Sequence, residues 1–445
     1  MHQILLLGAG RSASTLISYL LGEAKSNNWF VTVADQQLEI AQQKINGHES
    51  GKGVSLNVTD EAARKKIIAS HDIVISLLPP NLHDLVAGDC LQLKKNLATA
   101  SYVTRFQQEV QREVKNAGIL FLCEMGLDPG IDHMSAMEMI HTLKSEGAEI
   151  LSFKSATGGL VAPESDNNSW HYKVTWNPRN VVLAGQATSQ FLMNRKIHYL
   201  PYSRLFLETE KVKVKGLGNF EAYANRDSLS YIEKYELQNV PTIIRQTLRR
   251  EGYCKAWNAL VQLGLTDDSF QLHASNDMTY SQLTASFLNA GKKSLEEQLA
   301  KFLGEKKNSE IMQKVKWLGL LGNNKINLKN ATPAQAIQQL IEQKWKMNSD
   351  DKDMIVMRHE FIFKKGKKKF IREAVLVMKG EDQIHTAMSK TVGLPIGVAV
   401  KNILNKTIRQ KGVCIPVHQN IYQPVLKELM NYGVVFTENE KQISA

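Results

Sequence analysis

The first 130 residues contain six short apolar runs with helix-like segments between them, and this alternation constrains the fold more than any other feature of the chain. In order, the runs are ILLLG (4–8), WFVTVAD (29–35), VSLNV (54–58), DIVISLLP (72–79), LATASY (97–102) and ILFLCEMG (119–126). Short, continuously apolar runs rich in β-branched residues are typical of strands covered on both faces. Their alternation with helices predicts an α/β fold built on a Rossmann-type, doubly wound parallel sheet.

A glycine-rich turn follows the first run. Gly8, Gly10 and Ala13 form a G-x-G-x-x-A pattern. Gly8 permits a tight turn, Gly10 lets a pyrophosphate approach the backbone, and the small Ala13 allows the following helix to pack closely. The pattern therefore predicts a dinucleotide-binding turn, which comprises Gly8, Ala9, Gly10, Arg11, Ser12 and Ala13.

Asp35 ends the second run, near where a ribose-binding acid belongs. A carboxylate there accepts hydrogen bonds from both hydroxyls of an adenosine ribose, and it repels the 2′-phosphate of NADP. No arginine occurs between Val31 and Ile45, and Lys44 is the only basic residue in that window. We therefore predict NAD as the cofactor, with NADP as the alternative.

Ligands of a doubly wound sheet bind outside the carboxyl ends of its strands. The residues expected to line the cofactor site at these ends are Asn57, Val58, Leu77, Leu78, Ala100, Ser101, Leu127 and Asp128. The last two belong to the segment EMGLDPGIDHMSAM (124–137), which places three acids and a histidine where a buried strand ends.

Two interpretations of this segment stay open. Asp128 precedes Pro129, so it can be a helix N-cap with proline at the first helical position, and Asp132 would then lie in the first turn. We expect Asp128 to face a ligand as well. His133 is interpreted as a satisfied surface or interface histidine, with a catalytic role as the alternative.

Composition excludes some classes of protein. The four cysteines are scattered without a C-x-x-C pair, which favours a reducing, cytoplasmic location and indicates neither a zinc site nor disulfides. No apolar run is long enough to span a membrane, and we expect no signal peptide. The net charge of +11 includes the run KKGKKK (364–369), which is read as a hairpin tip. We see no basic stripe with interleaved aromatics, so nucleic-acid binding is not expected.

The chain changes character after about residue 150. Strand-like stretches predict a second mixed α/β sheet domain, and residues 228–345 read as a helical insertion that includes TIIRQTLRREGYCKAWNALVQLGL. Arg226 follows a strand-like run, whereas Thr247, Leu248 and Arg249 lie in a segment read as helical. Arginines can bind carboxylates bidentately, but spacing alone equally fits surface ion pairs.

With these motifs in view, the chain resembles the L-glutamate-forming saccharopine dehydrogenases, the saccharopine reductase family. The likeness extends from end to end and includes, in order, the glycine turn, ISLLP, TASY, GLDPGIDHM, GGLVAPE, YKVTWNP, NRD, TLR, KDMIVM and KTVGLP. One departure is Ala9, which stands where many members have serine.

The resemblance implies three parts. These are a nucleotide-binding domain at 1–130 completed by about 392–445, a substrate and dimerisation domain at 131–227 and 346–391, and the helical insertion at 228–345. It implies a homodimer of an enzyme of lysine metabolism, with small molecules as its only other partners. The implied reaction oxidises the secondary amine of saccharopine to an imine, which hydrolyses to glutamate and 2-aminoadipate 6-semialdehyde, or runs in reverse.

The resemblance also implies roles for individual residues. Ser101, Tyr102, Arg226, Thr247, Leu248 and Arg249 match positions that contact saccharopine, and Asp128 matches a position in the active-site turn. Asp128 or Tyr102 could mediate the proton transfers, because the amine must lose a proton and water must be activated. No metal is implied.

Two other readings compete with this one. A related dehydrogenase of C–N bonds, such as carboxynorspermidine dehydrogenase or lysine 6-dehydrogenase, would share the nucleotide domain but should lack the NRD and TLR pair. A non-catalytic protein that senses nucleotides or binds nucleic acid is the alternative from another class.

Overall fold

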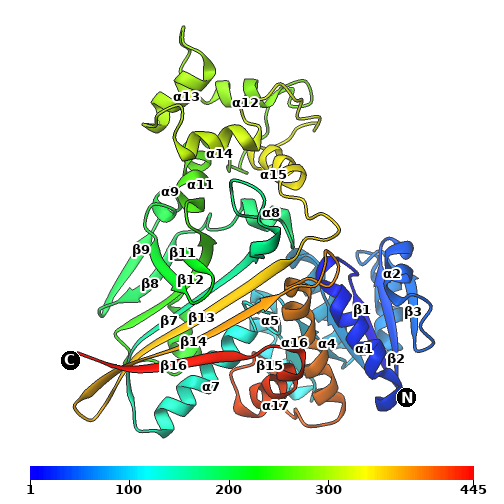
Figure 1. The fold of residues 1–445 in the computed structure, drawn as a ribbon. Helices are drawn as coiled ribbons and strands as arrows, with labels where there is room; N and C mark the ends of the chain where they lie inside the picture. Colours follow the sequence, from blue (N-terminus) through cyan, green and yellow to red (C-terminus); the bar gives the residue numbers. More distant parts are fainter. Residues whose placement is uncertain (445) are drawn as a thin grey trace. The chain divides into compact units, whose positions relative to one another are not determined.

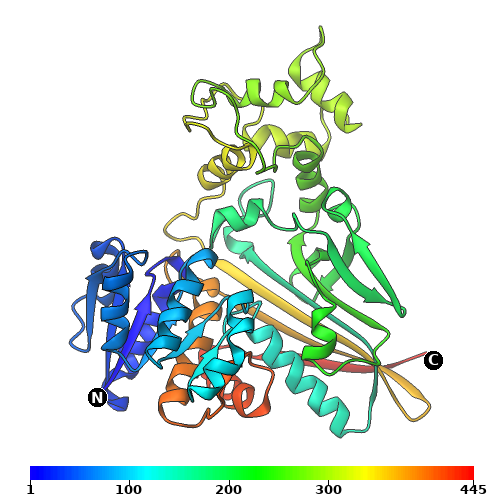
Figure 2. The same cartoon turned by 180° about the vertical axis from the view of Figure 1, so that it is seen from behind.

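The computed structural model describes residues 1–444, and the chain forms two compact units. The first unit comprises Met1–Glu149, Lys364–Lys368 and Ala374–Asn439. The second comprises Ile150–Phe363, Lys369–Glu373 and the chain from Glu440 on. Figures 1 and 2 show the chain from opposite sides.

The first unit is built on a seven-stranded sheet with the order β15-β6-β5-β4-β1-β2-β3. Every neighbouring pair in it is parallel. The strands are β1 (His2–Leu7), β2 (Trp29–Asp35), β3 (Gly51–Ser55), β4 (Ile73–Ser76), β5 (Asn96–Thr99), β6 (Leu120–Leu122) and β15 (Gly412–Cys414). The predicted doubly wound parallel sheet is confirmed.

One strand lies earlier than its apolar run suggested. The run VSLNV was expected to be a strand over 54–58, but β3 ends at Ser55. The reason is local, because the side-chain oxygen of Asn57 accepts hydrogen bonds from both the backbone N–H and the hydroxyl of Thr59. This Asx turn takes the chain out of the extended conformation.

Helices connect the strands of this sheet. They are α1 (Ser14–Asn27), α2 (Leu38–Ile45), α3 (Glu61–Ala69), α4 (His83–Gln92), α5 (Arg105–Glu109), α6 (Gln111–Asn116), α7 (Ile131–Ser145), α16 (Ala387–Leu404) and α17 (Gln419–Leu429), with 3-10 turns η1 (Arg11–Ala13), η2 (Pro80–Leu82) and η4 (Met430–Tyr432). Helices α3, α4 and α6 share one apolar core with the sheet through Ile68, Val86 and Val114.

Helices α1 and α16 lie side by side, although they come from opposite ends of the chain (Figures 1 and 2). Two glycines of α16 permit the close approach. A Cβ at Gly393 would lie 2.9 Å from the backbone nitrogen of Leu16, and one at Gly397 would lie 2.5 Å from the ring of Tyr19. The hydroxyl of Ser389 also accepts a hydrogen bond from the Thr15 N–H.

The second sheet has nine strands in the order β10-β11-β12-β7-β13-β14-β16, with β8 paired to β12 and β9. It is mixed, because β12 runs parallel to β7 and antiparallel to β11. The strands are β7 (Glu149–Val161), β8 (Ser189–Met193), β9 (Lys196–Leu200), β10 (Glu210–Val214), β11 (Gly218–Ala224), β12 (Thr242–Arg250), β13 (Asp353–Lys365), β14 (Lys368–Lys379) and β16 (Phe436–Ile443). The lysine-rich run forms the turn between β13 and β14, as predicted.

The remaining helices belong to the second unit. They are α8 (Pro178–Val182), α9 (Tyr202–Leu205), α10 (Ser230–Lys234), α11 (Tyr253–Gln262), α12 (Tyr280–Ser286), α13 (Leu295–Leu303), α14 (Glu310–Leu318) and α15 (Pro333–Lys344), with the 3-10 turn η3 (Pro163–Ser165). Their core contains three buried tryptophans, Trp170, Trp257 and Trp345.

The helical reading of TIIRQTLRR was wrong. These residues form strand β12, which pairs with β11, β7 and β8. Leu, Arg and Gln are good helix formers, but the β-branched residues Thr242, Ile243 and Ile244 open the segment and sheet pairing on both sides overrides the local preference. The helix begins only after Gly252, whose φ is +84°.

Packing of α1 on α16 can be tested with two glycine substitutions. Gly393→Ala should lower the free energy of unfolding by about 1–3 kcal/mol, because the added methyl group overlaps the backbone of Leu16. Gly22→Ala in α1 is the control, since no atom lies within 4 Å of the added Cβ. It should stabilise by about 0.5–1 kcal/mol. Thermal unfolding distinguishes the two, and equal shifts would contradict the close packing.

Candidate functional site

The predicted dinucleotide turn follows β1 and has the geometry that a pyrophosphate needs. Gly8 has φ +98°, and a Cβ there would lie 2.9 Å from the carbonyl oxygen of Leu77. By contrast, no atom lies within 4 Å of a Cβ added to Gly10, so space is open beside that backbone. The turn leads through η1 into α1, and helix N-termini offer free N–H groups to anions. Ala13 is buried, which leaves Arg11 and Ser12 as the accessible side chains of the turn.

Asp35 lies beside this turn. Its Oδ2 accepts a hydrogen bond from the Ala9 N–H at 2.8 Å, and its Oδ1 accepts one from the Gln37 N–H at 3.1 Å. The carboxylate therefore ties the end of β2 to the glycine turn. This is the position at which the acid of a dinucleotide site meets the adenosine ribose.

Lys44 reaches the same place from α2. Its ammonium donates a hydrogen bond to the carbonyl oxygen of Gly10. Burial lowers the pKa of Lys44 to about 8, although the nearby Asp35 carboxylate acts in the opposite direction. The ammonium of Lys44 thus lies near the carboxylate of Asp35.

The other residues predicted to line the cofactor site also lie beyond the carboxyl ends of strands in this sheet. Leu77 follows β4, and its N–H donates to the carbonyl oxygen of Leu7. Leu78 and Val58 pack against the apolar core, and Asn57 is engaged in its turn with Thr59. Leu78 and Val58 are therefore apolar walls at these strand ends, while the carbonyl oxygen of Leu77 packs against Gly8 of the glycine turn.

Ser101 is held by a buried histidine that sequence reasoning missed. The hydroxyl of Ser101 lies 2.7 Å from Nε2 of His83, whose Nδ1 lies 2.8 Å from the hydroxyl of Ser76. Burial lowers the pKa of His83, against an opposing effect of Asp84. The side chain is therefore a neutral imidazole at neutral pH that links the ends of β4 and β5. Its position seven residues after the strand end in ISLLPPNLH was the only signal.

Tyr102 is an exposed aromatic between anchored neighbours. The residue is 40% exposed. The residues around it are tied down, because the Ser101 N–H donates to the hydroxyl of Thr99 and the Val103 N–H donates to Oε1 of Glu124. Ala100 precedes Ser101 just after β5. A Cβ added to Gly126 would lie 3.1 Å from the Cβ of Ala100, so the two residues pack closely. The ring is thus presented at the carboxyl end of the sheet.

The segment that follows β6 differs from the helix-cap expectation. Helix α7 begins at Ile131, and Gly130 with φ +147° occupies its N-cap. Asp128 therefore lies two residues before the cap, and the peptide bond between Asp128 and Pro129 is cis. Its interpretation as an N-cap was wrong, because a Cβ at Gly130 would lie 2.0 Å from the Gly126 carbonyl oxygen and only glycine can make the turn. Leu127 is buried and Asp128 is partly exposed.

Asp132 and His133 are buried in the first turn of α7. Asp132 accepts a hydrogen bond from the Gly130 N–H at 2.6 Å. His133 was expected at a surface or interface, but it is fully buried and its Nε2 lies 2.7 Å from Oε2 of Glu124. The acids and the histidine of this segment thus bind to one another and to the backbone, and Asp128 is the acid that remains partly exposed.

The remaining candidate substrate residues, Arg226 and Thr247 to Arg249, belong to the second unit. Arg226 lies just after β11, with φ +40°, and Thr247, Leu248 and Arg249 lie on the neighbouring β12. Alternation along the strand places Thr247 and Arg249 on one face and the fully buried Leu248 on the other. The pairing of Tyr223 with Thr247 brings the end of β11 next to this face.

Arg249 is a buried cation in an aromatic setting. Its guanidinium lies 5.1, 5.8 and 5.4 Å from the ring centroids of Tyr172, Tyr223 and Tyr253. It donates to the carbonyl oxygen of Leu248, and its Nε has no hydrogen-bond partner among the described residues. Burial works against the charge, yet the surrounding tyrosines raise the pKa of Arg249 above its usual range. Within residues 1–444 no acidic side chain forms an ion pair with it.

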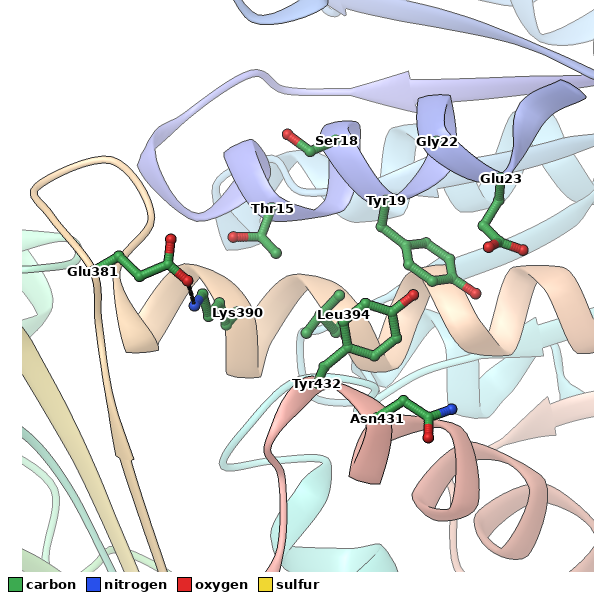
Figure 3. Close-up of a pocket in the computed structure, with 10 residues that line it drawn as sticks. All are labelled: Thr15, Ser18, Tyr19, Gly22, Glu23, Glu381, Lys390, Leu394, Asn431 and Tyr432. Carbon is green, nitrogen blue, oxygen red and sulfur yellow. Dashed lines mark hydrogen bonds and ion pairs between the residues drawn. The ribbon is translucent and has the colours of Figure 1, made fainter.

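A separate cavity of about 600 Å³ lies between α1, α16 and η4 (Figure 3). None of the predicted site residues lines it. Tyr19 and Tyr432 meet edge to face there with ring centroids 5.8 Å apart, and Lys390 pairs with Glu381. In the described part of the chain, no group of His, Cys, Asp and Glu could hold a metal ion, and no helix is long and apolar enough to cross a membrane.

Comparison with known proteins agrees with this geometry. Two family models together match most of the chain, namely the saccharopine dehydrogenase NADP binding domain over residues 4–122 and the saccharopine dehydrogenase C-terminal domain over residues 126–434. The chain belongs to the saccharopine dehydrogenase family. The resemblance seen in the sequence motifs is confirmed.

Individual relatives differ in length. The chain is 33% identical to saccharopine dehydrogenase [NADP(+), L-glutamate-forming] of Schizosaccharomyces pombe, over 98% of this chain and 99% of that protein. It is 35% identical to mitochondrial alpha-aminoadipic semialdehyde synthase of Mus musculus, over 98% of this chain and 47% of that protein. The chain thus spans about half the length of the animal relatives that it matches.

The fold agrees with a solved structure of the family. Apo saccharopine dehydrogenase (L-Glu forming) from Saccharomyces cerevisiae superimposes with a TM-score of 0.89 at 30% sequence identity, over 100% of both chains. The homospermidine synthase of Legionella pneumophila, solved with NAD, shares the fold alone, with a TM-score of 0.57 and 11% identity over 99% of this chain and 91% of that one.

The buried His83 should make the protein sensitive to acid. Its folded-state pKa lies below the ordinary value of about 6.5, so the unfolded chain binds a proton that the folded chain refuses. Stability from this histidine is therefore present above about pH 6.5 and falls as the pH decreases. Burial lowers the pKa of His71 in the same way. His83→Gln should reduce the drop in melting temperature between pH 7 and pH 5, and an unchanged drop would show that His83 is not the responsible group.

Proposed function

We propose that this chain is an NAD(P)-dependent, L-glutamate-forming saccharopine dehydrogenase, an oxidoreductase that acts on a CH–NH group in lysine metabolism. The observation that carries the proposal is the likeness to the S. pombe protein of that name, which covers 98% of this chain and 99% of that protein. Saccharopine, water and the oxidised cofactor give glutamate, 2-aminoadipate 6-semialdehyde, the reduced cofactor and a proton.

The glycine turn, Asp35 and the apolar walls would hold the cofactor. When bound, a nicotinamide supplies the acceptor for the hydride. The residues of this chain then have to orient the carbon that carries the hydride, take the proton of the secondary amine, and activate water for attack on the imine. Tyr102 and Asp128 are the candidates for proton transfer. Both are partly exposed and both follow strands of the parallel sheet at its carboxyl edge.

Recognition of the substrate carboxylates is assigned to Arg226 and Arg249, with Thr247 beside them. Arg249 is buried and has no ion pair with an acid, which supports this assignment. A guanidinium forms its strongest hydrogen bonds with a carboxylate, and a carboxylate of the substrate could supply them. Ser101 and Tyr102 are also assigned to saccharopine binding, as the sequence resemblance implies. Leu248 would contribute through its backbone, since its side chain belongs to the core.

For the cofactor we favour NAD over NADP. NADP is the alternative, because the S. pombe relative is an NADP(+) enzyme by name and the matching family model is an NADP binding domain. Asp35 supports NAD, because its carboxylate lies beside the glycine turn, where it accepts from the Ala9 N–H and where an adenosine ribose is expected. Lys44 supports tolerance of NADP, because it places an ammonium within reach of that turn. A cytoplasmic location and a homodimer also belong to the proposal. The free state of all four cysteines supports a reducing compartment.

A steady-state assay of saccharopine oxidation with each nicotinamide cofactor tests the function. We expect reduced cofactor, glutamate and the semialdehyde in equal amounts. Turnover of carboxynorspermidine or lysine in place of saccharopine would favour a related C–N dehydrogenase. Binding of nucleotide without turnover of any of these substrates would favour a non-catalytic sensor.

The role of Arg249 can be isolated with a matched pair of variants. Arg249→Met keeps the volume of the side chain but removes the charge, and it should weaken saccharopine binding by about 2–4 kcal/mol. Arg250→Met is the control, because Arg250 packs over Phe220 and donates to the Leu217 carbonyl oxygen. Isothermal titration with saccharopine should show the loss only for Arg249. Equal affinity in both variants would remove Arg249 from the site.

Cofactor preference should depend on Asp35 and Lys44 in opposite ways. Asp35→Asn removes the charge that repels a 2′-phosphate, and it should shift the ratio of kcat/KM towards NADP by about tenfold, or about 1.4 kcal/mol. Lys44→Met should shift the ratio towards NAD. The ratios follow from initial rates with saturating saccharopine. A wild-type enzyme with higher kcat/KM for NADP would contradict the preference for NAD.

A further inference from the structure

Glu124 is a buried acid in an unusual backbone conformation. Its side chain is 1% exposed, and its φ of +58° lies in the left-handed region, which side chains other than glycine, asparagine and aspartate rarely adopt. Such a residue persists only where its surroundings determine it, and conformations of this kind concentrate at functional sites. The contacts of Glu124 show what determines it here.

Two of these contacts hold one short segment, residues 101–103. The Glu124 N–H donates to the carbonyl oxygen of Ser101 at 3.0 Å. Its Oε1 accepts from the Val103 N–H at 3.3 Å. Glu124 therefore binds the backbone on both sides of Tyr102, and Tyr102 itself stays 40% exposed.

The other carboxylate oxygen of Glu124 is held by a histidine of α7. Oε2 of Glu124 lies 2.7 Å from Nε2 of His133, which is fully buried in the first turn of α7. A carboxylate suits this place because it accepts on both oxygens, whereas an alanine would leave the Val103 N–H and the His133 ring without these bonds. The pair thus fixes the side-chain rotamer from which Glu124 reaches Val103.

We propose that Glu124 is a positioning residue for the reaction, which holds Tyr102 and Ser101 in place through the backbone, and that His133 orients its carboxylate. The proposal rests on the proposed function, since it assumes that Tyr102 and Ser101 act on saccharopine. It assigns Glu124 no contact with the reacting atoms.

The first test needs no substrate. In Glu124→Ala, hydrogen exchange of the backbone amides in residues 101–104 should become about tenfold faster or more. Local opening then costs less free energy, because the hydrogen bond to the Glu124 side chain no longer has to be broken. Glu124→Gln should show a smaller increase, since its amide oxygen can still accept from Val103. Unchanged exchange in both variants would overturn the proposal, whatever substrate the protein uses.

The second test measures coupling to Tyr102. Glu124→Ala should lower kcat for saccharopine by about 100-fold, the size of effect that a displaced catalytic group produces. Glu124→Gln should restore a large part of this loss. In a Tyr102→Phe background the further loss caused by Glu124→Ala should largely disappear, because both changes remove the same contribution. Losses that multiply in the double variant would mean that Glu124 acts independently of Tyr102, and would overturn the proposal.

His71→Gln is the matched control. His71 is also a buried histidine of the first unit, but it binds Thr32 and precedes β4 at the opposite edge of the sheet. Its variant should change the melting temperature without changing exchange at 101–104 or showing coupling to Tyr102. If the wild-type protein does not oxidise saccharopine, the proposed function fails while the exchange measurement still decides whether Glu124 holds the segment.

Discussion

The parallel register of β1, β2, β4, β5 and β6 is the constraint on which the first unit depends. Leu7 pairs with Ala34 and with Ser76, and Ser76 pairs with Thr99. Because parallel strands end at one edge, the next residues of each chain segment must emerge together. This register therefore gathers the glycine turn, Asp35, Leu77 and Ser101 at one place, although more than ninety residues separate the first from the last.

A second layer of the site consists of buried polar groups that satisfy one another. His83 joins Ser76 to Ser101, and His133 joins Glu124 to α7. In a low-dielectric interior such bonds are strong when complete and costly when a partner is missing, so they hold loop residues in defined positions. The exposed Tyr102 thus gains a fixed position from neighbours that are hidden from solvent.

In the second unit, a buried cation plays the corresponding part. Arg249 is surrounded by three tyrosine rings, which stabilise a positive charge through their π faces and exclude water. Among residues 1–444 this charge has no ion pair with an acid, and that observation supports the proposed role of Arg249 in binding a substrate carboxylate. Its charge and its burial together distinguish Arg249 from the surface arginines as the candidate for substrate recognition.

The sequence by itself determined the parallel sheet, the glycine turn, the acid at the end of β2 and the family. These follow from local patterns: continuous apolar runs, glycines where backbone must pass closely, and motifs that stay in order. It could not determine that TIIRQTLRR is a strand, because good helix formers become a strand only when neighbouring strands pair with them. Nor could it place the helix start at Ile131, which depends on the close contact between Gly130 and Gly126. The contacts of His83, His133 and Glu124 were decided by tertiary structure alone, since hydrogen bonds between residues distant in sequence leave no periodic or local signal.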